Sequence, residues 1–224
     1  MIVLDHISKR FGKNLVLTDI NFKTECSKIY ALQGRNGAGK TTLIRIALGL
    51  LPADSGTVRV LDKDPQSNWA VRQKIGVVCD DDAYFPELTV EEYLWWVGRL
   101  RSLTNAACKK QIDELTRAFY LYERQNHAIR SLSHGMQRKM LIASAFIGSP
   151  KLIVMDEPTS GLDAESLDVL ANLLQEHACR GNTALLSCHD KTFVKNTCTD
   201  IVVLDGGRTR IVDKVKYLSD APAS

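Results

Sequence analysis

The feature that most constrains this chain is a glycine-rich segment between an apolar run and a helix-forming run. Residues Gly34 to Thr41 read GRNGAGKT, follow the run YALQ and precede TLIRIALGL. This spacing fits the pattern G-x-x-x-x-G-K-[ST], in which glycines let backbone N–H groups point inward around an anion. The helix that follows adds the positive end of its dipole. The segment is therefore predicted to bind phosphate, and a plain glycine-rich turn with an exposed lysine is the alternative.

The loop residues have separate predicted roles toward ATP and Mg²⁺. Lys40 is expected to bridge the β- and γ-phosphates, which makes it a catalytic as well as a binding residue, and Thr41 is expected to offer its hydroxyl to Mg²⁺. The predicted nucleotide-binding residues of the loop are Gly34, Arg35, Asn36, Gly37, Ala38, Gly39, Lys40, Thr41 and Thr42.

A second segment, LIVMDE, ends an apolar run in two carboxylates, Asp156 and Glu157. A buried strand of this kind places negative charge at the carboxyl edge of a sheet, where ligands of open α/β sheets bind. Asp156 is expected to hold Mg²⁺, and Glu157 to orient and polarise the attacking water as a catalytic base. For an isolated DE pair, a helix N-cap after a core strand is the alternative. Together with the phosphate loop, the pair indicates a P-loop NTPase core.

Alternating apolar runs and helical stretches predict an α/β protein with a mainly parallel sheet. The first two candidate strands and the run near Thr57 alternate polar with apolar residues, so we expect a small N-terminal antiparallel β subdomain. The candidate strands are Ile2 to Ile7, Leu15 to Phe22, Ile29 to Gln33, Thr57 to Leu61, Ile75 to Cys79, Leu152 to Met155, Thr183 to Leu186 and Ile201 to Leu204.

The pattern changes to helical after Thr89, which can cap a helix whose first turn carries Glu91 and Glu92. Further helices are predicted over about 105–120 and 135–147, with no strand candidate between them. The stretch therefore indicates a helical subdomain inserted into the α/β core.

The length fits one domain, 1–224, divided into a core of 1–86 and 150–224 and a helical subdomain of about 87–149. The net charge of +3 is too small to predict a nucleic-acid surface, so no nucleic-acid partner is expected. The apolar runs are too short to cross a bilayer, and the N-terminus does not predict a signal peptide. Six cysteines without a CxxC pair favour reduced, mostly buried thiols over disulfides or a zinc site.

The segment LSHGMQRK, from Leu132 to Lys139, distinguishes among kinds of P-loop NTPase. It resembles the ABC signature motif, usually LSGGQ, and it lies shortly before the LIVMDE strand as in that family. Phe11 in KRFGK stands where an aromatic residue stacks on adenine in the family. Pro158 and the SGLD segment 160–163 resemble the D-loop, and His189 in LLSCHD resembles the switch histidine. The resemblance covers nearly the whole chain.

This resemblance implies an ATPase subunit of an ABC transporter, driven by ATP-dependent dimerisation with a second copy or a paralogous subunit. Each ATP would contact the phosphate loop of one subunit and the signature residues Ser133 and Gly135 of the other. His189 would contact the γ-phosphate and act in catalysis. A multi-spanning membrane permease is the implied further partner. The subunit would then be peripheral, on the cytoplasmic side of the cell membrane.

Two departures from the family pattern are informative. His134 and Met136 replace the first glycine and the glutamine of LSGGQ, and such variants look similar to those of ATPases that serve ABC-2 type exporters. Asp80 stands where the Q-loop glutamine is usual, and its carboxylate is a suitable Mg²⁺ ligand. A solvated acidic loop with a one-residue slip is the alternative for Asp80.

The aromatic residues after this loop lie in the region that receives the coupling helix of the membrane subunit in the family. About half of them are expected to pack inside the helical subdomain instead. They are Tyr84, Phe85, Tyr93, Trp95 and Trp96. A soluble ABC ATPase in cofactor or cluster assembly is the alternative to a transporter subunit. A regulatory module without turnover is disfavoured by the intact Lys40, Asp156, Glu157 and His189.

Overall fold

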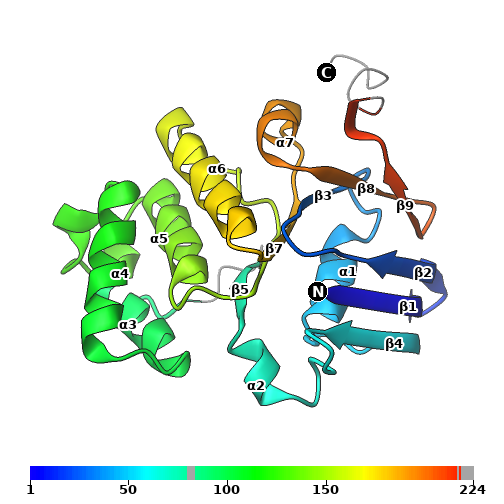
Figure 1. The fold of residues 1–224 in the computed structure, drawn as a ribbon, viewed down its shortest axis with the longest axis horizontal. Helices are drawn as coiled ribbons and strands as arrows, with labels where there is room; N and C mark the ends of the chain where they lie inside the picture. Colours follow the sequence, from blue (N-terminus) through cyan, green and yellow to red (C-terminus); the bar gives the residue numbers. More distant parts are fainter. Residues whose placement is uncertain (80–83, 216, 218–224) are drawn as a thin grey trace.

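Two β-sheets organise the chain in the computed structural model, which describes residues 1–79, 84–215 and 217 (Figure 1). The smaller sheet has the order β2-β1-β4, and its strands pair antiparallel. It comprises β1 (Ile2–Phe11), β2 (Asn14–Lys23) and β4 (Ser55–Val60). This sheet confirms the predicted antiparallel subdomain near the N-terminus.

The larger sheet has six strands in the order β5-β6-β7-β3-β8-β9. Its pairings are parallel except for that of β9 with β8, so the predicted mainly parallel sheet is confirmed. Every residue of β3, β6 and β7 is buried, as expected for strands covered on both faces. The strands are β3 (Ile29–Gln33), β5 (Ile75–Val78), β6 (Leu152–Met155), β7 (Thr183–Ser187), β8 (Asp200–Asp205) and β9 (Arg208–Val212).

The helices fall into a group beside the sheet and a group that covers it (Figure 1). The first group is α3 (Val90–Leu100), α4 (Asn105–Ala118) and α5 (His134–Phe146), with 3₁₀ turns at Tyr122–Arg124 and Ile129–Ser131. The second group is α1 (Lys40–Ala47), α6 (Ala164–Cys179) and α7 (Lys191–Thr197), and the short α2 (Trp69–Arg72) follows the small sheet. None of the helices in the described part of the chain is long and apolar enough to cross a membrane.

Two hydrophobic clusters lie on opposite faces of the large sheet because successive strand residues point to opposite sides. One cluster joins the sheet to α1 and the small sheet, and the other joins it to the remaining helices from α3 to α7. In β6, Val154 belongs to the first cluster and Ile153 to the second. The sheet is thus the rigid layer on which loops at its carboxyl edge are held.

Local capping signals in the helical group are as predicted. Thr89 accepts from the backbone N–H of Glu92, and the Glu92 carboxylate accepts from the N–H of Thr89. This reciprocal capping box fixes the start of α3. The division of the chain into a core and an inserted subdomain stays a prediction.

Three short elements, α2, α7 and β9, are additions to the predicted set. The four-residue α2 is too short to show helical periodicity. Strand β9 follows a turn at Gly206 and Gly207, and its RTRIV sequence carries exposed charges because it is an edge strand.

All six cysteines are free thiols, but the expectation that they are mostly buried applies to only half of them. Cys108, Cys188 and Cys198 are buried, whereas Cys26 and Cys179 are exposed. Cys26 lies in the turn between β2 and β3, and Cys179 is the last residue of α6, so neither lies inside a strand, where the sheet would have covered it.

Candidate nucleotide-binding site

The glycine-rich loop lies between β3 and α1, as its sequence predicts. Gly37 and Gly39 have φ angles of 78° and 102°, in the left-handed region that side chains with a Cβ rarely adopt. A Cβ at Gly34 would lie 2.5 Å from the backbone oxygen of Leu204, so the loop passes against the carboxyl end of β8. The glycines therefore allow both the turn and this close approach.

A cavity of about 470 Å³ lies over this loop at the carboxyl edge of the large sheet. Its lining comprises Phe11, Val16, Asn36, Gly37, Gly39, Lys40, Thr41, Thr42, Asp156, Glu157 and His189. Nearly all of these are predicted site residues, and only Val16 is new. The predicted loop residues Gly34, Arg35 and Ala38 do not line the cavity. The fold thus brings segments from β1 to β7 to one place.

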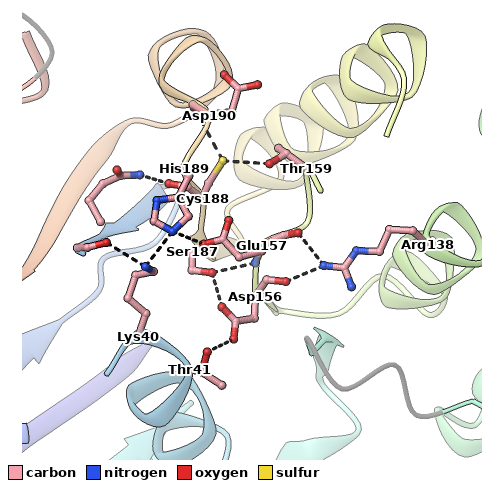
Figure 2. Close-up of polar contacts among 12 residues, drawn as sticks. Lys40, Thr41, Arg138, Asp156, Glu157, Thr159, Ser187, Cys188, His189 and Asp190 are labelled. Atoms are coloured by element: carbon pink, nitrogen blue, oxygen red, sulfur yellow. Dashed lines mark hydrogen bonds and ion pairs between the residues drawn. The ribbon is translucent and has the colours of Figure 1, made fainter. Parts of the chain in front are cut away.

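Lys40, His189 and Glu157 form a chain of polar contacts inside the cavity (Figure 2). His189 Nε2 lies 3.1 Å from Lys40 Nζ and 3.1 Å from Glu157 Oε1. Lys40 Nζ also donates to the Gly34 carbonyl at 2.9 Å. The Nε2 atom can accept from Lys40 in one tautomer or donate to Glu157 in the other. A cation, an imidazole and a carboxylate thus converge on one point.

Asp156 and Thr41 form the second contact in the cavity (Figure 2). Thr41 Oγ1 donates to Asp156 Oδ2 at 2.6 Å, and the Asp156 residue is only 2% exposed. The other carboxylate oxygen accepts a short hydrogen bond from Ser187 Oγ. Ser187 Oγ in turn accepts from the backbone N–H of Glu157 at 2.8 Å. One hydroxyl thus holds both acidic residues.

Sequence reasoning missed Ser187, although a signal was present. It is a polar residue at the end of the apolar run TALLS, and it is fully buried at the end of β7. Because β7 pairs with β6, a polar side chain at this end lies beside the carboxylates that end β6. The strand order needed for that argument was unknown from the sequence.

Arg138 in α5 is the second residue that was missed. It is 7% exposed, and its Nη2 atom donates to the carbonyls of Asp156 and Glu157, each at 2.7 Å. Figure 2 shows the guanidinium reaching these carbonyls from α5, on the side opposite Lys40. A lone arginine in a helical run gives no signal for this, because its partners are 18 and 19 residues away.

Phe11 lies at the end of β1 and lines the cavity beside Val16. The residue is 49% exposed, and Lys9 Nζ lies 5.5 Å from the centre of its ring. A partly exposed ring at the cavity wall offers a flat apolar face to a planar ligand group.

The signature residues do not line the cavity of their own chain. Ser133 is the N-cap of α5, and its hydroxyl accepts from the Met136 N–H at 3.3 Å. A Cβ at Gly135 would lie 3.1 Å from the Gly161 carbonyl, so the signature segment packs against the D-loop segment. The predicted metal ligand Asp80 lies outside the described residues.

An ion pair ties the same two segments together. Lys139 Nζ lies 2.6 Å from Asp163 Oδ2, and Asp163 Oδ1 accepts from the Ser166 N–H as the N-cap of α6. The Lys139 contact, followed by the bonds with Ser166, lowers the pKa of Asp163 to about 2. The start of α6 is thereby fixed relative to α5.

The comparisons with known proteins agree with this geometry. Residues 17–160, more than half of the chain, match the family model described as ABC transporter. The chain is 32% identical to the Nod factor export ATP-binding protein I of Ralstonia nicotianae, over 92% of this chain and 64% of that protein. It is 33% identical to the linearmycin resistance ATP-binding protein LnrL of Bacillus subtilis, over 92% of this chain and 67% of that protein. It thus spans about two thirds of the length of these relatives.

A solved structure described as the ATP binding subunit of an ABC transporter superposes with a TM-score of 0.90. It is 27% identical, and the match covers 98% of this chain and 95% of that one. The family match, the relatives, the shared fold and the convergence of the phosphate loop with the two carboxylates lead to one assignment. The chain belongs to the ABC transporter family and contains an ABC ATPase domain.

Proposed function

We propose that this subunit binds ATP with Mg²⁺ and hydrolyses it to drive export by a membrane permease. The observation that carries the proposal is the convergence of Lys40, Glu157 and His189 in one cavity at the carboxyl edge of the sheet. Phosphoryl transfer depends mainly on positioning and electrostatic stabilisation, which is what such an arrangement supplies.

The residues at the base of the cavity fit Mg²⁺. Thr41 and Asp156 offer a hydroxyl and a carboxylate, 2.6 Å apart, and hard oxygen ligands suit this ion. Within the described ranges, no three His, Cys, Asp or Glu side chains form a metal cluster. An Mg²⁺ ion held by Thr41 and Asp156 would take further ligands from nucleotide oxygens and water, as is usual for this ion. When bound, the ion neutralises phosphate charge.

Each polar residue of the cavity has a proposed role. Lys40 and the amino end of α1 bind the negative phosphates. Glu157 orients the attacking water and accepts its proton. His189 lies next to both Lys40 and Glu157, where it can contact the γ-phosphate and keep the Glu157 carboxylate in position beside it. Phe11 supports the adenine ring at the cavity wall.

A second subunit completes the site in this proposal. Ser133 and Gly135 lie at the amino end of α5, where a hydroxyl and free backbone N–H groups can bind a phosphate. They lie outside the cavity of their own chain, so they would serve the nucleotide of a second copy or of a paralogue. ATP would then hold two subunits together until it is hydrolysed.

Two observations favour export over cofactor or cluster assembly. The relatives with 32–33% identity are named for Nod factor export and for linearmycin resistance. The LSHGM segment from Leu132 to Met136 resembles the signature of exporter ATPases. The same resemblance supports a peripheral location on the cytoplasmic side of the membrane.

Exposed aromatic side chains provide a candidate surface for the permease. Phe85 is 51% and Trp96 43% exposed, and their rings meet edge to face with centroids 5.1 Å apart. Tyr93 is only 6% exposed and belongs to the hydrophobic core, so it packs the subdomain instead. Exposed, mutually supported aromatics are frequent anchors of protein interfaces.

The catalytic part of the proposal is tested with Glu157→Gln and Lys40→Ala. Glu157→Gln should keep ATP affinity and lower kcat by about 10²–10⁴-fold, because a positioned base is lost. With ATP and Mg²⁺ it should accumulate as a dimer in size-exclusion chromatography, whereas Lys40→Ala should stay monomeric. Lys110→Ala, at an exposed lysine of α4, is the control for a change of charge. Wild-type turnover in Glu157→Gln would contradict the proposal.

The permease contact is tested with Phe85→Ala combined with Trp96→Ala. The double variant should keep its ATPase activity in isolation and lose its recovery with the membrane fraction. Trp69→Ala is a matched control, because Trp69 is 60% exposed on α2, away from this pair. Equal membrane recovery of all three proteins would exclude the surface as the permease contact.

A further inference from the structure

We propose that Arg138 is the positioning residue that sets the direction of the Glu157 carboxylate, an inference that rests on the proposed role of Glu157 as the base. The two residues come from different parts of the fold, because Arg138 belongs to α5 and Glu157 follows β6. The contact therefore joins the helical group to the carboxyl edge of the sheet (Figure 2).

The backbone at Glu157 needs external support. Its φ angle is 47°, in the left-handed region that is unfavourable for a residue with a Cβ. Such a conformation persists only when surrounding contacts over-determine it. Ser187 holds the N–H side of this residue at 2.8 Å, and Arg138 holds its carbonyl at 2.7 Å. The turn is thus fixed from both sides, and the side chain is directed toward His189.

The guanidinium of Arg138 is buried among backbone carbonyls at the ends of two neighbouring strands. Besides Asp156 and Glu157, it approaches the carbonyl of Cys79 at 3.4 Å, just after β5. Hydrogen bonds from a charged donor are stronger and more directional than neutral ones. The planar fork of arginine can serve several carbonyls at once, which a lysine ammonium cannot do in the same geometry.

A second arginine, the partly buried Arg101, shows what a purely structural role looks like. Arg101 donates to the carbonyl of Ile75 at 2.9 Å, at the start of β5, and to that of Ile147, at the end of α5. The two arginines thus fasten α5 along β5 at opposite ends. Only Arg138 contacts the backbone of a proposed catalytic residue, so Arg101 is a matched control.

Because Arg138 belongs to α5, its contact with Glu157 also connects the proposed catalytic base to the signature residues at the start of this helix. Ser133 caps this helix, and Gly135 lies in its first turn. A displacement of α5 by a second subunit at the signature would therefore move the carbonyl of Glu157 through Arg138. Hydrolysis would then respond to engagement of the signature, because the seated α5 supplies one of the two hydrogen bonds that hold this carbonyl, the other coming from the Ser160 N–H at 3.2 Å.

The test compares Arg138→Met, Arg138→Lys and Arg101→Met. Arg138→Met should lower kcat by about 10²-fold, the loss expected for a misplaced catalytic group, with the Kd for ATP within about twofold of wild type. Arg138→Lys keeps the charge but not the planar fork, so its kcat should lie between those of wild type and Arg138→Met. Arg101→Met should lower Tm and keep kcat within about threefold. A structural role alone would give the two methionine variants the same pattern.

A double variant distinguishes action through Glu157 from an independent effect. In a Glu157→Gln background, Arg138→Met should lower kcat by no more than about twofold further, because the group that it positions is already gone. Fully additive losses, or wild-type kcat in a folded Arg138→Met protein, would overturn the inference. If Arg138→Met does not fold, the same cycle with Arg138→Lys decides the question. Equal turnover of wild type and Glu157→Gln would instead overturn the proposed function.

Discussion

His189 Nε2 lies 3.1 Å from the carboxylate oxygen Oε1 of Glu157, across the carboxyl ends of two neighbouring strands, β6 and β7. The same nitrogen lies 3.1 Å from Lys40 Nζ. The loop that carries His189 is held by Gln33, whose amide donates a short hydrogen bond to the Cys188 carbonyl. The histidine is therefore placed by the end of β3, the strand that leads into the phosphate loop. His189 is therefore a shared neighbour of Lys40, a proposed phosphate-binding residue, and Glu157, the proposed catalytic base.

Replacing His189 by alanine should lower kcat by about 10²-fold, because one positioned hydrogen-bond group near the transferring phosphate is lost. The Kd for ATP should change little, since Lys40 and the loop remain. The measurement is phosphate release at saturating ATP together with nucleotide titration. His127→Ala, at an exposed histidine after the first 3₁₀ turn, is the control. A kcat near wild type in His189→Ala would rule out a direct role.

Replacing Ser187 by alanine should destabilise the protein by about 1–3 kcal/mol, because the buried Asp156 carboxylate and the partly buried N–H of Glu157 lose their shared partner. The free energy of unfolding in urea measures the loss, and kcat should fall with it. Ser144→Ala is a matched control: Ser144 is also buried, but its hydroxyl donates only to the Leu141 carbonyl in its own helix. Its loss should stay below about 1 kcal/mol. Equal losses would show that the Asp156 contact adds nothing.

Lys139 should control the titration of Asp163. The Lys139 contact, followed by the hydrogen bonds with Ser166, lowers the pKa of Asp163 to about 2 from an ordinary value of 3.8, so these contacts stabilise the folded state above pH 3.8. The stabilisation is lost as the pH falls through about 2. The Asp163 side chain is 58% exposed, so solvent screening limits the gain to below about 1 kcal/mol. In Lys139→Met, an NMR titration should show a higher pKa for Asp163, and an unchanged pKa would refute the coupling.

The cysteines should react in distinct groups with a thiol reagent at pH 8. Cys26 and Cys179 are exposed and should react first, and the intermediate Cys79 should follow. Burial raises the pKa of Cys188, and it raises that of Cys198 to about 12, so these thiols stay protonated and unreactive. They should react only on unfolding. The double variant with Cys26→Ser and Cys179→Ser should lack the fast phase of the thiol reaction. A fast phase that persists in this variant would contradict the assignment.

The features that the sequence predicts well are those that depend on neighbours along the chain. The phosphate loop needs its own glycines and the helix that follows, and the capping box at Thr89 needs only Glu92, three residues later. Unbroken apolar runs at β3 and β6 predict strands that are covered on both faces. Weakly patterned pieces such as β9 carry no such signal.

By itself, the sequence determined that this chain has an ATP-binding loop, a pair of acidic residues after a buried strand and the fold class that brings the two together. Only the tertiary structure decided that Ser187 holds both acidic residues and that Arg138 supports the Glu157 turn. It also placed Ser133 and Gly135 outside the cavity of their own chain. The physical reason is that these contacts depend on strand order and on the seating of α5, which arise from packing between distant segments.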